Sequence, residues 1–291
     1  MSIFEEPKID CHNHVFDPVR FPYAPDAHYA PAGQEIGTAA QLLAVFDAYG
    51  VQHALVVGPN SGYGTDSRCL LDVLARGNGR LKGAAVVHNA VSRSELADLQ
   101  AAGVIGITFQ AALLGVDYYA GTADLLAELA SLGMVVDVQV EGDQLVSLLP
   151  LLQRSDVLIL IDHCGRPTPG AGVDQPGFRA LLGLADTGRV AVKLSGLIKC
   201  SRQGYPYQDA WPYVRALTEA FGFGALLWGS DWPFLRASER IDYGPLLRLV
   251  ERLVPEPADR RRLLWDTPRA LFGFGEDKPA LSCLVRGTAG A

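Results

Sequence analysis

Short apolar segments alternate with longer amphipathic segments along almost the whole chain. The apolar segments are rich in valine, isoleucine and leucine, which is typical of strands buried on both faces of a parallel sheet. The amphipathic segments repeat their apolar positions with the period of a helix that covers such a sheet. The predicted strands span residues 8–14, 52–58, 83–88, 104–110, 134–140, 157–163, 190–195 and 225–231.

Helices are predicted between these strands in the same phase. Ser92 and Glu95 have the spacing of a capping box, and Gly103 and Gly133 stand where helices end. The predicted helices span residues 38–49, 65–78, 92–102, 122–132, 143–154, 176–187, 209–221 and 243–253, with a further helix at 257–272. Eight strand–helix units predict an α/β fold, a (β/α)8 TIM barrel that forms a single domain over residues 1–274, with a surface tail at 275–291.

The connection after the first predicted strand, residues 15–37, is unusually long and rich in Pro, Tyr and Ala. Long loops at the carboxyl ends of barrel strands often cover the substrate. We therefore expect this loop at the active site, and whether it closes over the substrate as a lid stays open.

Composition narrows the range of partners. The chain has 291 residues, of which 49% are hydrophobic, and 25 basic against 32 acidic residues give a formal net charge of −7. A mildly acidic protein without a basic cluster is a poor ligand for nucleic acid or for an anionic membrane. We expect a small molecule as the partner, with no nucleic acid and no membrane, and a homodimer stays open.

The cysteines and the first residues favour a cytoplasmic protein. No apolar run reaches the roughly 18 residues that a membrane-spanning helix needs, and residues 1–6 lack the basic and apolar parts of a signal peptide. The cysteines are odd in number and form no CxxC pair, as expected for reduced thiols: Cys11, Cys69, Cys164, Cys200 and Cys283.

Polar residues at strand ends carry the chemistry, because the active site of a parallel barrel lies at the carboxyl ends of its strands. On the first strand, His12 and His14 alternate with Cys11 and Asn13, so a period of two puts both histidines on one face. Such a pair can hold a divalent cation, or it can present two N–H groups to one substrate oxygen.

Two further strand ends supply candidates of the same kind. His163 ends the sixth predicted strand, and Asp231 ends the eighth after Trp228-Gly-Ser. Either could be a purely structural strand-end group. Together with the histidine pair, however, Asp231 could serve as a general base or as a ligand of a metal that activates water.

These residues resemble the amidohydrolase superfamily (amidohydrolase-related family 2), which has HxH on the first strand, a later histidine and an aspartate on the eighth strand. Longer segments resemble its 2-pyrone-4,6-dicarboxylate lactonases, and together they cover residues 9 to about 272. They are residues 10–18, the FPYAP segment that begins at residue 21, residues 64–66, residues 161–167 and residues 228–233.

The resemblance implies a hydrolase that opens a lactone ring in the degradation of aromatic compounds. Asp231 would take a proton from water, while His12, His14 and His163 would polarise the ring carbonyl. The same four residues would be the ligands of a single divalent ion, zinc or manganese, if one is bound; the dicarboxylate lactonases need none. A metal-dependent decarboxylase and a sugar-acid lactonase of the same superfamily are the alternatives.

Departures from the family pattern bear on metal content and substrate. Thr108 and Gln139 stand where binuclear members have stronger ligands, so a second metal is not expected. Lys199 stands where the lactonases have an arginine, and an ammonium group cannot clamp a carboxylate with two parallel hydrogen bonds. The candidate substrate-binding residues are Lys199, Arg166, Gln139, Asn60, Ser61 and Tyr63, although the cations could equally be surface groups and residues 59–63 a simple turn.

Overall fold

The computed structural model describes residues 2–275, which form a barrel of eight parallel strands. Each strand pairs with the next along the chain, from β1 to β8. The barrel closes between β1 and the turn after β8, where the Asp231 N–H donates to the His12 carbonyl and the His14 N–H donates to the Trp232 carbonyl, both at 2.8 Å. The strands are β1 (Lys8–Asn13), β2 (Val51–Val57), β3 (Leu81–Ala85), β4 (Val104–Gln110), β5 (Val135–Gln139), β6 (Leu158–Ile161), β7 (Val190–Leu194) and β8 (Leu226–Trp228).

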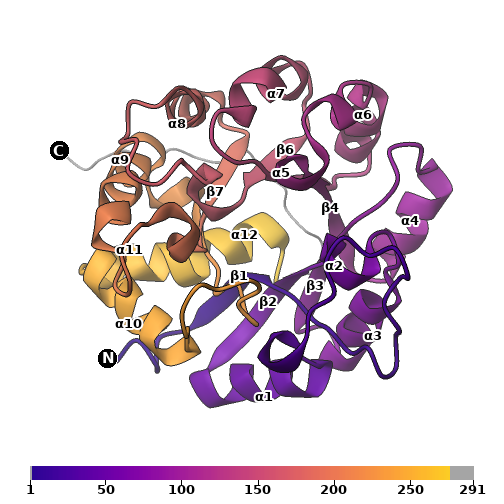
Figure 1. Cartoon of the computed structure of the whole chain (residues 1–291), viewed down its shortest axis with the longest axis horizontal. Helices are drawn as coiled ribbons and strands as arrows, with labels where there is room; N and C mark the ends of the chain where they lie inside the picture. The colour runs from indigo at the N-terminus through magenta and orange to yellow at the C-terminus, as the bar shows by residue number, and fades with distance from the viewer. Residues whose placement is uncertain (1, 276–291) are drawn as a thin grey trace.

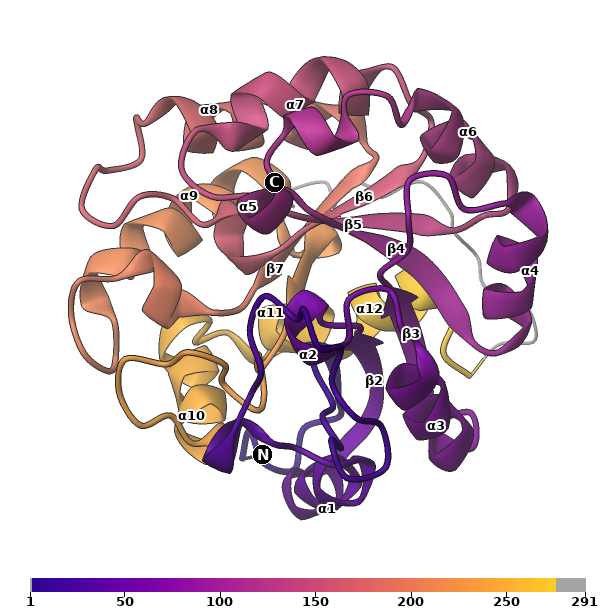
Figure 2. The ribbon, with the colours of Figure 1, turned by 45° about the vertical axis from the view of Figure 1, so that its right-hand side comes forward.

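Helices form an outer ring around the strands (Figures 1 and 2). Ser92 caps its helix as the sequence predicts, because its hydroxyl accepts from the Glu95 N–H and the Glu95 carboxylate accepts from the Ser92 N–H. The short helices α2 (Asn60–Tyr63) and α5 (Ala111–Leu114) follow β2 and β4. The covering helices are α1 (Ala39–Tyr49), α3 (Arg68–Gly77), α4 (Arg93–Ala101), α6 (Ala123–Ser131), α7 (Gln144–Gln153), α8 (Pro176–Leu182), α9 (Trp211–Phe221) and α10 (Tyr243–Leu253). The single-domain (β/α)8 TIM barrel is thereby confirmed.

Alternating strand residues supply two separate hydrophobic cores. Val56, Val136 and Ile159 belong to the large core between the strands and the helices, whereas Leu55 and Leu160 belong to a smaller core inside the barrel. Each fully buried side chain of this size contributes about 1.5–3 kcal/mol, compared with about 0–1 kcal/mol for an exposed ion pair. These two cores, rather than the surface ion pairs, therefore hold the barrel together.

The segment after α10 closes the amino-terminal end of the barrel. It forms α11 (Pro257–Arg261), a π-helical turn (Arg262–Asp266) and α12 (Thr267–Phe272), so the predicted further helix over 257–272 is confirmed in its bounds, with a π-helical turn inside it that was not predicted. Pro268 has no N–H to continue the regular hydrogen-bond ladder. Leu271, Phe272 and Phe274 join the core inside the barrel and seal its floor with apolar rings.

Two strand predictions are displaced at their ends. β3 begins and ends earlier than predicted, at Leu81 and Ala85, and β8 ends at Trp228 rather than at Asp231. The chain cannot stay extended at Asp231, whose φ of 61° is left-handed. The predicted tail at 275–291 lies outside the described residues except for Gly275.

Among residues 2–275, no helix has the length and apolarity needed to cross a bilayer. The described cysteines are all buried and unpaired: Cys11, Cys69, Cys164 and Cys200.

Candidate active site

The four residues predicted to be catalytic meet at the carboxyl ends of the strands. The Nε2 atoms of three histidines point at one oxygen, Oδ1 of Asp231. The distances are 3.6 Å for His12, 3.5 Å for His14 and 3.9 Å for His163. All four residues are buried, at most 8% exposed. His12 on β1 and residues that directly follow β1, β6 and β8 thus form a single cluster of three imidazoles and a carboxylate.

Local backbone irregularity makes this convergence sterically feasible. The pairing of β1 with β2 shifts between Asp10 and Asn13, and Cys11 packs in the interior core although the neighbouring His12 also faces the inside of the barrel. Simple alternation along β1 is therefore interrupted. A Cβ atom at Gly229 would lie 2.5 Å from the His12 Cβ, so only glycine lets β8 approach β1 this closely.

The histidines are oriented by partners on their Nδ1 atoms. His14 Nδ1 lies 2.8 Å from the Val57 carbonyl oxygen, which can only accept, so Nδ1 carries the proton. His12 Nδ1 lies 3.1 Å from Asp162 Oδ1, closer than the Lys193 nitrogen at 3.3 Å, so we assign its proton to Nδ1 as well. When neutral, both rings therefore present a lone pair on Nε2 to the Asp231 carboxylate.

His163 is held by the loop after β7. Its Nδ1 lies 2.9 Å from the Ser195 hydroxyl, and its backbone φ of 51° is left-handed. Gly196 permits this packing, because a Cβ there would lie 2.7 Å from the His163 Nδ1. Left-handed backbone at both His163 and Asp231 is strain that the surrounding structure must enforce.

Electrostatics favour the neutral forms of His12 and His163 and the ionised form of Asp231. Burial lowers the pKa of His12 to about 4 and lowers the pKa of His163 well below its ordinary value. Burial would raise the pKa of Asp231, but Lys199, whose Nζ lies 2.6 Å from Asp231 Oδ2, and the surrounding histidines together outweigh it and hold that pKa well below the usual range.

The donor set suits one divalent cation. The Nε2 atoms of His12 and His163 are buried without a hydrogen-bond partner. The lone pairs of the histidine Nε2 atoms face the Asp231 carboxylate, and no positive group of residues 2–275 lies between the imidazoles and that carboxylate. Imidazole nitrogens whose other N–H donates to a carbonyl or a carboxylate, together with one carboxylate oxygen, are characteristic zinc ligands. The cluster therefore requires either a shared proton or a metal ion.

A second, fully buried cluster of charges lies beneath His12. Lys193 Nζ lies 2.6 Å from Asp137 Oδ2 and 2.9 Å from Asp162 Oδ1. Burial raises the pKa of Asp137 well above its usual range. Burial opposes ionisation of Asp162, but His12 and Lys193 hold its pKa well below that range, and the two aspartates raise the pKa of Lys193 despite its burial. The cluster therefore holds one ammonium, one carboxylate and one neutral carboxyl group.

Asp10 connects β1 to the turn that carries Asp231. Its carboxylate accepts from the Ser230 N–H at 3.0 Å, from the Ser230 hydroxyl at 2.6 Å and from the Tyr243 hydroxyl at 2.9 Å. The side chain is completely buried. These bonds fix the position of Asp231 relative to His12.

A polar pocket of about 550 Å³ opens above the histidines. It contains five of the six predicted substrate-binding residues, Lys199, Arg166, Gln139, Asn60 and Ser61. Tyr63 does not line it: this residue is buried, and its hydroxyl accepts from the Asp17 N–H at 2.9 Å. The pocket also contains residues outside the predicted set: His28, Gln110, Glu141 and Arg236.

The long loop at 15–37 contributes to this pocket through His28. The loop is fastened to α2, because the Gly62 N–H donates to the Tyr29 carbonyl at 2.7 Å and the Ala24 N–H donates to the Gly62 carbonyl at 2.8 Å. Its predicted place at the active site is therefore correct.

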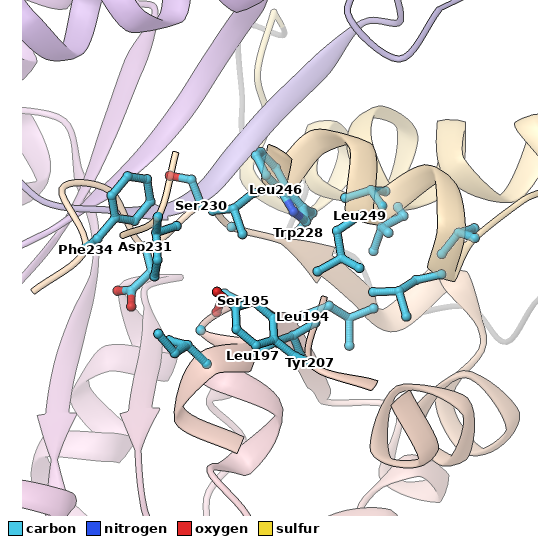
Figure 3. A pocket seen from close by; sticks show the side chains of 18 residues that line it. Leu194, Ser195, Leu197, Tyr207, Trp228, Ser230, Asp231, Phe234, Leu246 and Leu249 are labelled. Atoms are coloured by element: carbon cyan, nitrogen blue, oxygen red, sulfur yellow. The ribbon is translucent and has the colours of Figure 1, made fainter. Parts of the chain in front are cut away.

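A second cavity also reaches Asp231, between β7, β8 and α10. Figure 3 shows Asp231 at one end of it, with Trp228, Leu246 and Leu249 at the other. Its volume is about 40 Å³, which suits water rather than a substituted ring. The larger polar pocket is therefore the candidate substrate site.

Sequence reasoning missed the buried charges that support the histidines. Asp137, Asp162 and Lys193 are single charged residues within or directly after runs of Val, Leu and Ile on strands predicted to be fully buried. A charge in such a run is the available signal, because an ionised side chain is kept there only when it is paired.

Comparison with known proteins assigns the family. A family model described as amidohydrolase matches residues 9–274, so the chain belongs to the amidohydrolase family. It is 34% identical over 276 residues to 4-sulfomuconolactone hydrolase of Rhizobium radiobacter, covering 91% of this chain and 89% of that relative. It is 30% identical over 277 residues to 2-pyrone-4,6-dicarboxylate hydrolase of Comamonas testosteroni, with the same coverage.

Solved structures agree with this family assignment. A probable 2-pyrone-4,6-dicarboxylic acid hydrolase of Acinetobacter baumannii, with citric acid bound, superposes with a TM-score of 0.85 at 28% identity, covering 92% of this chain and 99% of that one. The 2,6-dihydroxybenzoate decarboxylase of Rhizobium is more distant, with a TM-score of 0.63 at 14% identity, and shares the fold alone. The relatives from Rhizobium radiobacter and Comamonas testosteroni, and the more similar of the two solved structures, are thus named lactone hydrolases.

Proposed function

We propose that this protein hydrolyses a lactone that carries an acid group, with Asp231 as the general base. The observation that carries the proposal is the convergence of three histidine Nε2 atoms on Asp231 Oδ1 at the floor of the polar pocket. The kinship with named lactone hydrolases supports the reaction class.

The proposed reaction adds water across the ring ester bond. Asp231 takes a proton from water, and the water oxygen attacks the lactone carbonyl carbon. The bond between that carbon and the ring oxygen then breaks, and the proton passes to the departing oxygen. The products are an alcohol or enol and a carboxylic acid, which releases the second proton of the water to solvent and becomes a carboxylate.

The chain's own residues prepare this step in two ways. Lys199 favours the ionised form of Asp231, and Asp162 and Val57 orient His12 and His14 toward the reacting carbonyl. A divalent ion held by His12, His14, His163 and Asp231 would supply Lewis-acid polarisation of that carbonyl when bound. Whether zinc, manganese or no metal serves here is settled by assay with and without a chelator.

A sugar-acid lactone is a second candidate substrate. Asn60, Ser61, Gln110 and Gln139 line the pocket and are uncharged groups that can bond ring hydroxyls. A decarboxylase is disfavoured, because the decarboxylase structure is the more distant match.

The first prediction concerns Asp231. We expect Asp231→Asn to lower kcat for lactone opening by about 10²–10⁴-fold, because an amide cannot accept the proton from water. Asp242→Asn is the matched control, since Asp242 is an exposed partner of Arg240 outside the polar pocket. Ring opening is measured by absorbance on pyrone, muconolactone and aldonolactone substrates. Unchanged turnover in Asp231→Asn contradicts the proposed base.

A further inference from the structure

Arg236 lies in the turn after β8, on the wall of the substrate pocket. It also lines an adjoining recess of about 140 Å³, together with Lys199 and Asp231. The residue is exposed, so its guanidinium is open to a ligand.

The pairing of the pocket cations sets Arg236 apart. Lys199 is paired with Asp231 at 2.6 Å, and Arg166 Nη2 is paired with Glu141 Oε2 at 3.0 Å. The Arg236 guanidinium, by contrast, forms no ion pair with a carboxylate of residues 2–275. It lies over the ring of Tyr29, with its Cζ atom 4.8 Å from the ring centroid. A guanidinium that rests on an aromatic face keeps its N–H edges available for an anion.

Contacts to its own backbone hold Arg236 in place beside the pocket. Its N–H donates to Glu35 Oε1 at 2.6 Å, and the Tyr29 hydroxyl bonds the other oxygen of the same carboxylate. Its φ of 55° is left-handed, a conformation that costs a non-glycine residue about 1–3 kcal/mol and persists only where its surroundings impose it. The loop at 15–37 and the turn after β8 thus jointly fix this arginine at the pocket.

Among the described residues, the lysines and arginines that line the pocket are Arg166, Lys199 and Arg236. Asn60, Ser61, Gln110 and Gln139 are neutral hydrogen-bonding groups. The pocket therefore has one cation that is not already paired with a protein carboxylate, and this suits one acid group better than two.

We propose that Arg236 binds the acid group of the substrate and selects lactones that carry a single carboxylate or sulfonate. This inference rests on the proposed function and deepens it, because it assigns the substrate class to a residue in the turn after β8. The acid group bonds the guanidinium, while the neutral side chains bond the remaining oxygens of the ring.

The test compares a pyrone monocarboxylate with its methyl ester. We expect the wild type to favour the acid in kcat/KM, and Arg236→Gln to lose about 10–100-fold on the acid, mainly through KM, with little change on the ester. Arg236→Lys should recover part of the loss, because it restores the charge without the planar fork. Arg240→Gln is the control, since Arg240 pairs with Asp242 outside the pocket.

Two outcomes separate failure of the inference from failure of the proposed function. If the wild type opens both compounds and Arg236→Gln still prefers the acid, the inference is wrong and the lactonase proposal stands. If no lactone is opened, the proposed function fails, and calorimetric binding of the same carboxylate then tests Arg236 directly. Binding that is equal in wild type and Arg236→Gln overturns the inference.

Discussion

Two lysines, Lys8 and Lys193, are completely buried and lie toward opposite ends of the barrel. Lys193, near the carboxyl end of β7, contacts the carboxylates of Asp137 and Asp162. Lys8, at the start of β1, donates to the carbonyls of Phe4 at 3.2 Å and Tyr49 at 2.9 Å. Burial lowers the pKa of Lys8 to about 8, whereas the carboxylates raise the pKa of Lys193 in spite of burial.

The difference shows what each end of the barrel is built for. Lys8 caps the last carbonyl of α1, that of Tyr49, and its charge contacts no group of the candidate active site. Lys193 belongs to a cluster of buried charged groups that contacts His12. The charge of Lys193 therefore affects the orientation of the His12 imidazole, a candidate catalytic group. Lys8 and Lys193 are therefore equally buried but have different roles.

The largest expected effect is that of Lys193→Met. It leaves the buried Asp162 carboxylate without its cation, which costs about 3–5 kcal/mol of stability, and it also loosens the orientation of His12. Urea unfolding and kcat on the lactone substrate measure the two effects. Lys8→Met is the matched control and should leave kcat unchanged. A Lys193→Met protein as stable and active as the wild type contradicts the comparison.

The next prediction distinguishes the roles of the two carboxyl groups that contact Lys193. Asp162→Asn removes the carboxylate that lies 3.1 Å from His12 Nδ1 and to which we assign its proton contact, so kcat should fall about 10–100-fold. Asp137→Asn should cost less than about 1 kcal/mol and little activity, because an amide resembles the protonated acid that burial favours there. If Asp137→Asn proves the more damaging variant, the proton has been assigned to the wrong carboxyl group.

The smallest effect concerns Lys8 and pH. Its folded pKa of about 8 lies below the ordinary 10.5, so between these values the unfolded chain holds a proton that the folded chain has released. Stability should therefore rise with pH in this range, by an amount on the order of 1 kcal/mol relative to Lys8→Met. Urea midpoints of both proteins at pH 8 and pH 10 measure the difference. Identical pH profiles would rule out a lowered pKa for Lys8.

The sequence predicts most of the fold because strand burial and helix periodicity are local patterns. It also predicts the cluster of His12, His14, His163 and Asp231, because the ends of parallel strands meet at one face of a barrel. The irregular end of β1 and the π-helical turn before α12 were not predicted, since both depend on packing between segments distant in sequence.

The supporting charges and the pairing of cations were also beyond prediction. No local sequence pattern indicates that Asp10 contacts Ser230 and Tyr243. Nor does any local pattern indicate that Arg166 pairs with Glu141 while Arg236 lies over the Tyr29 ring. Each of these contacts joins loops or strands whose proximity only the closed barrel determines. Tyr63 was misplaced for the same reason, because its neighbours Phe16 and Tyr23 come from the long loop.

The closure between β1 and the turn after β8 has a consequence for the order in which this protein becomes active. Asp10 and Ser230, which meet there, are 220 residues apart along the chain. A chain emerging from the ribosome has made His12 and His14 long before the aspartate that completes the site. Catalytic competence therefore coincides with the last strand joining the first, and enzyme activity reports the completion of folding.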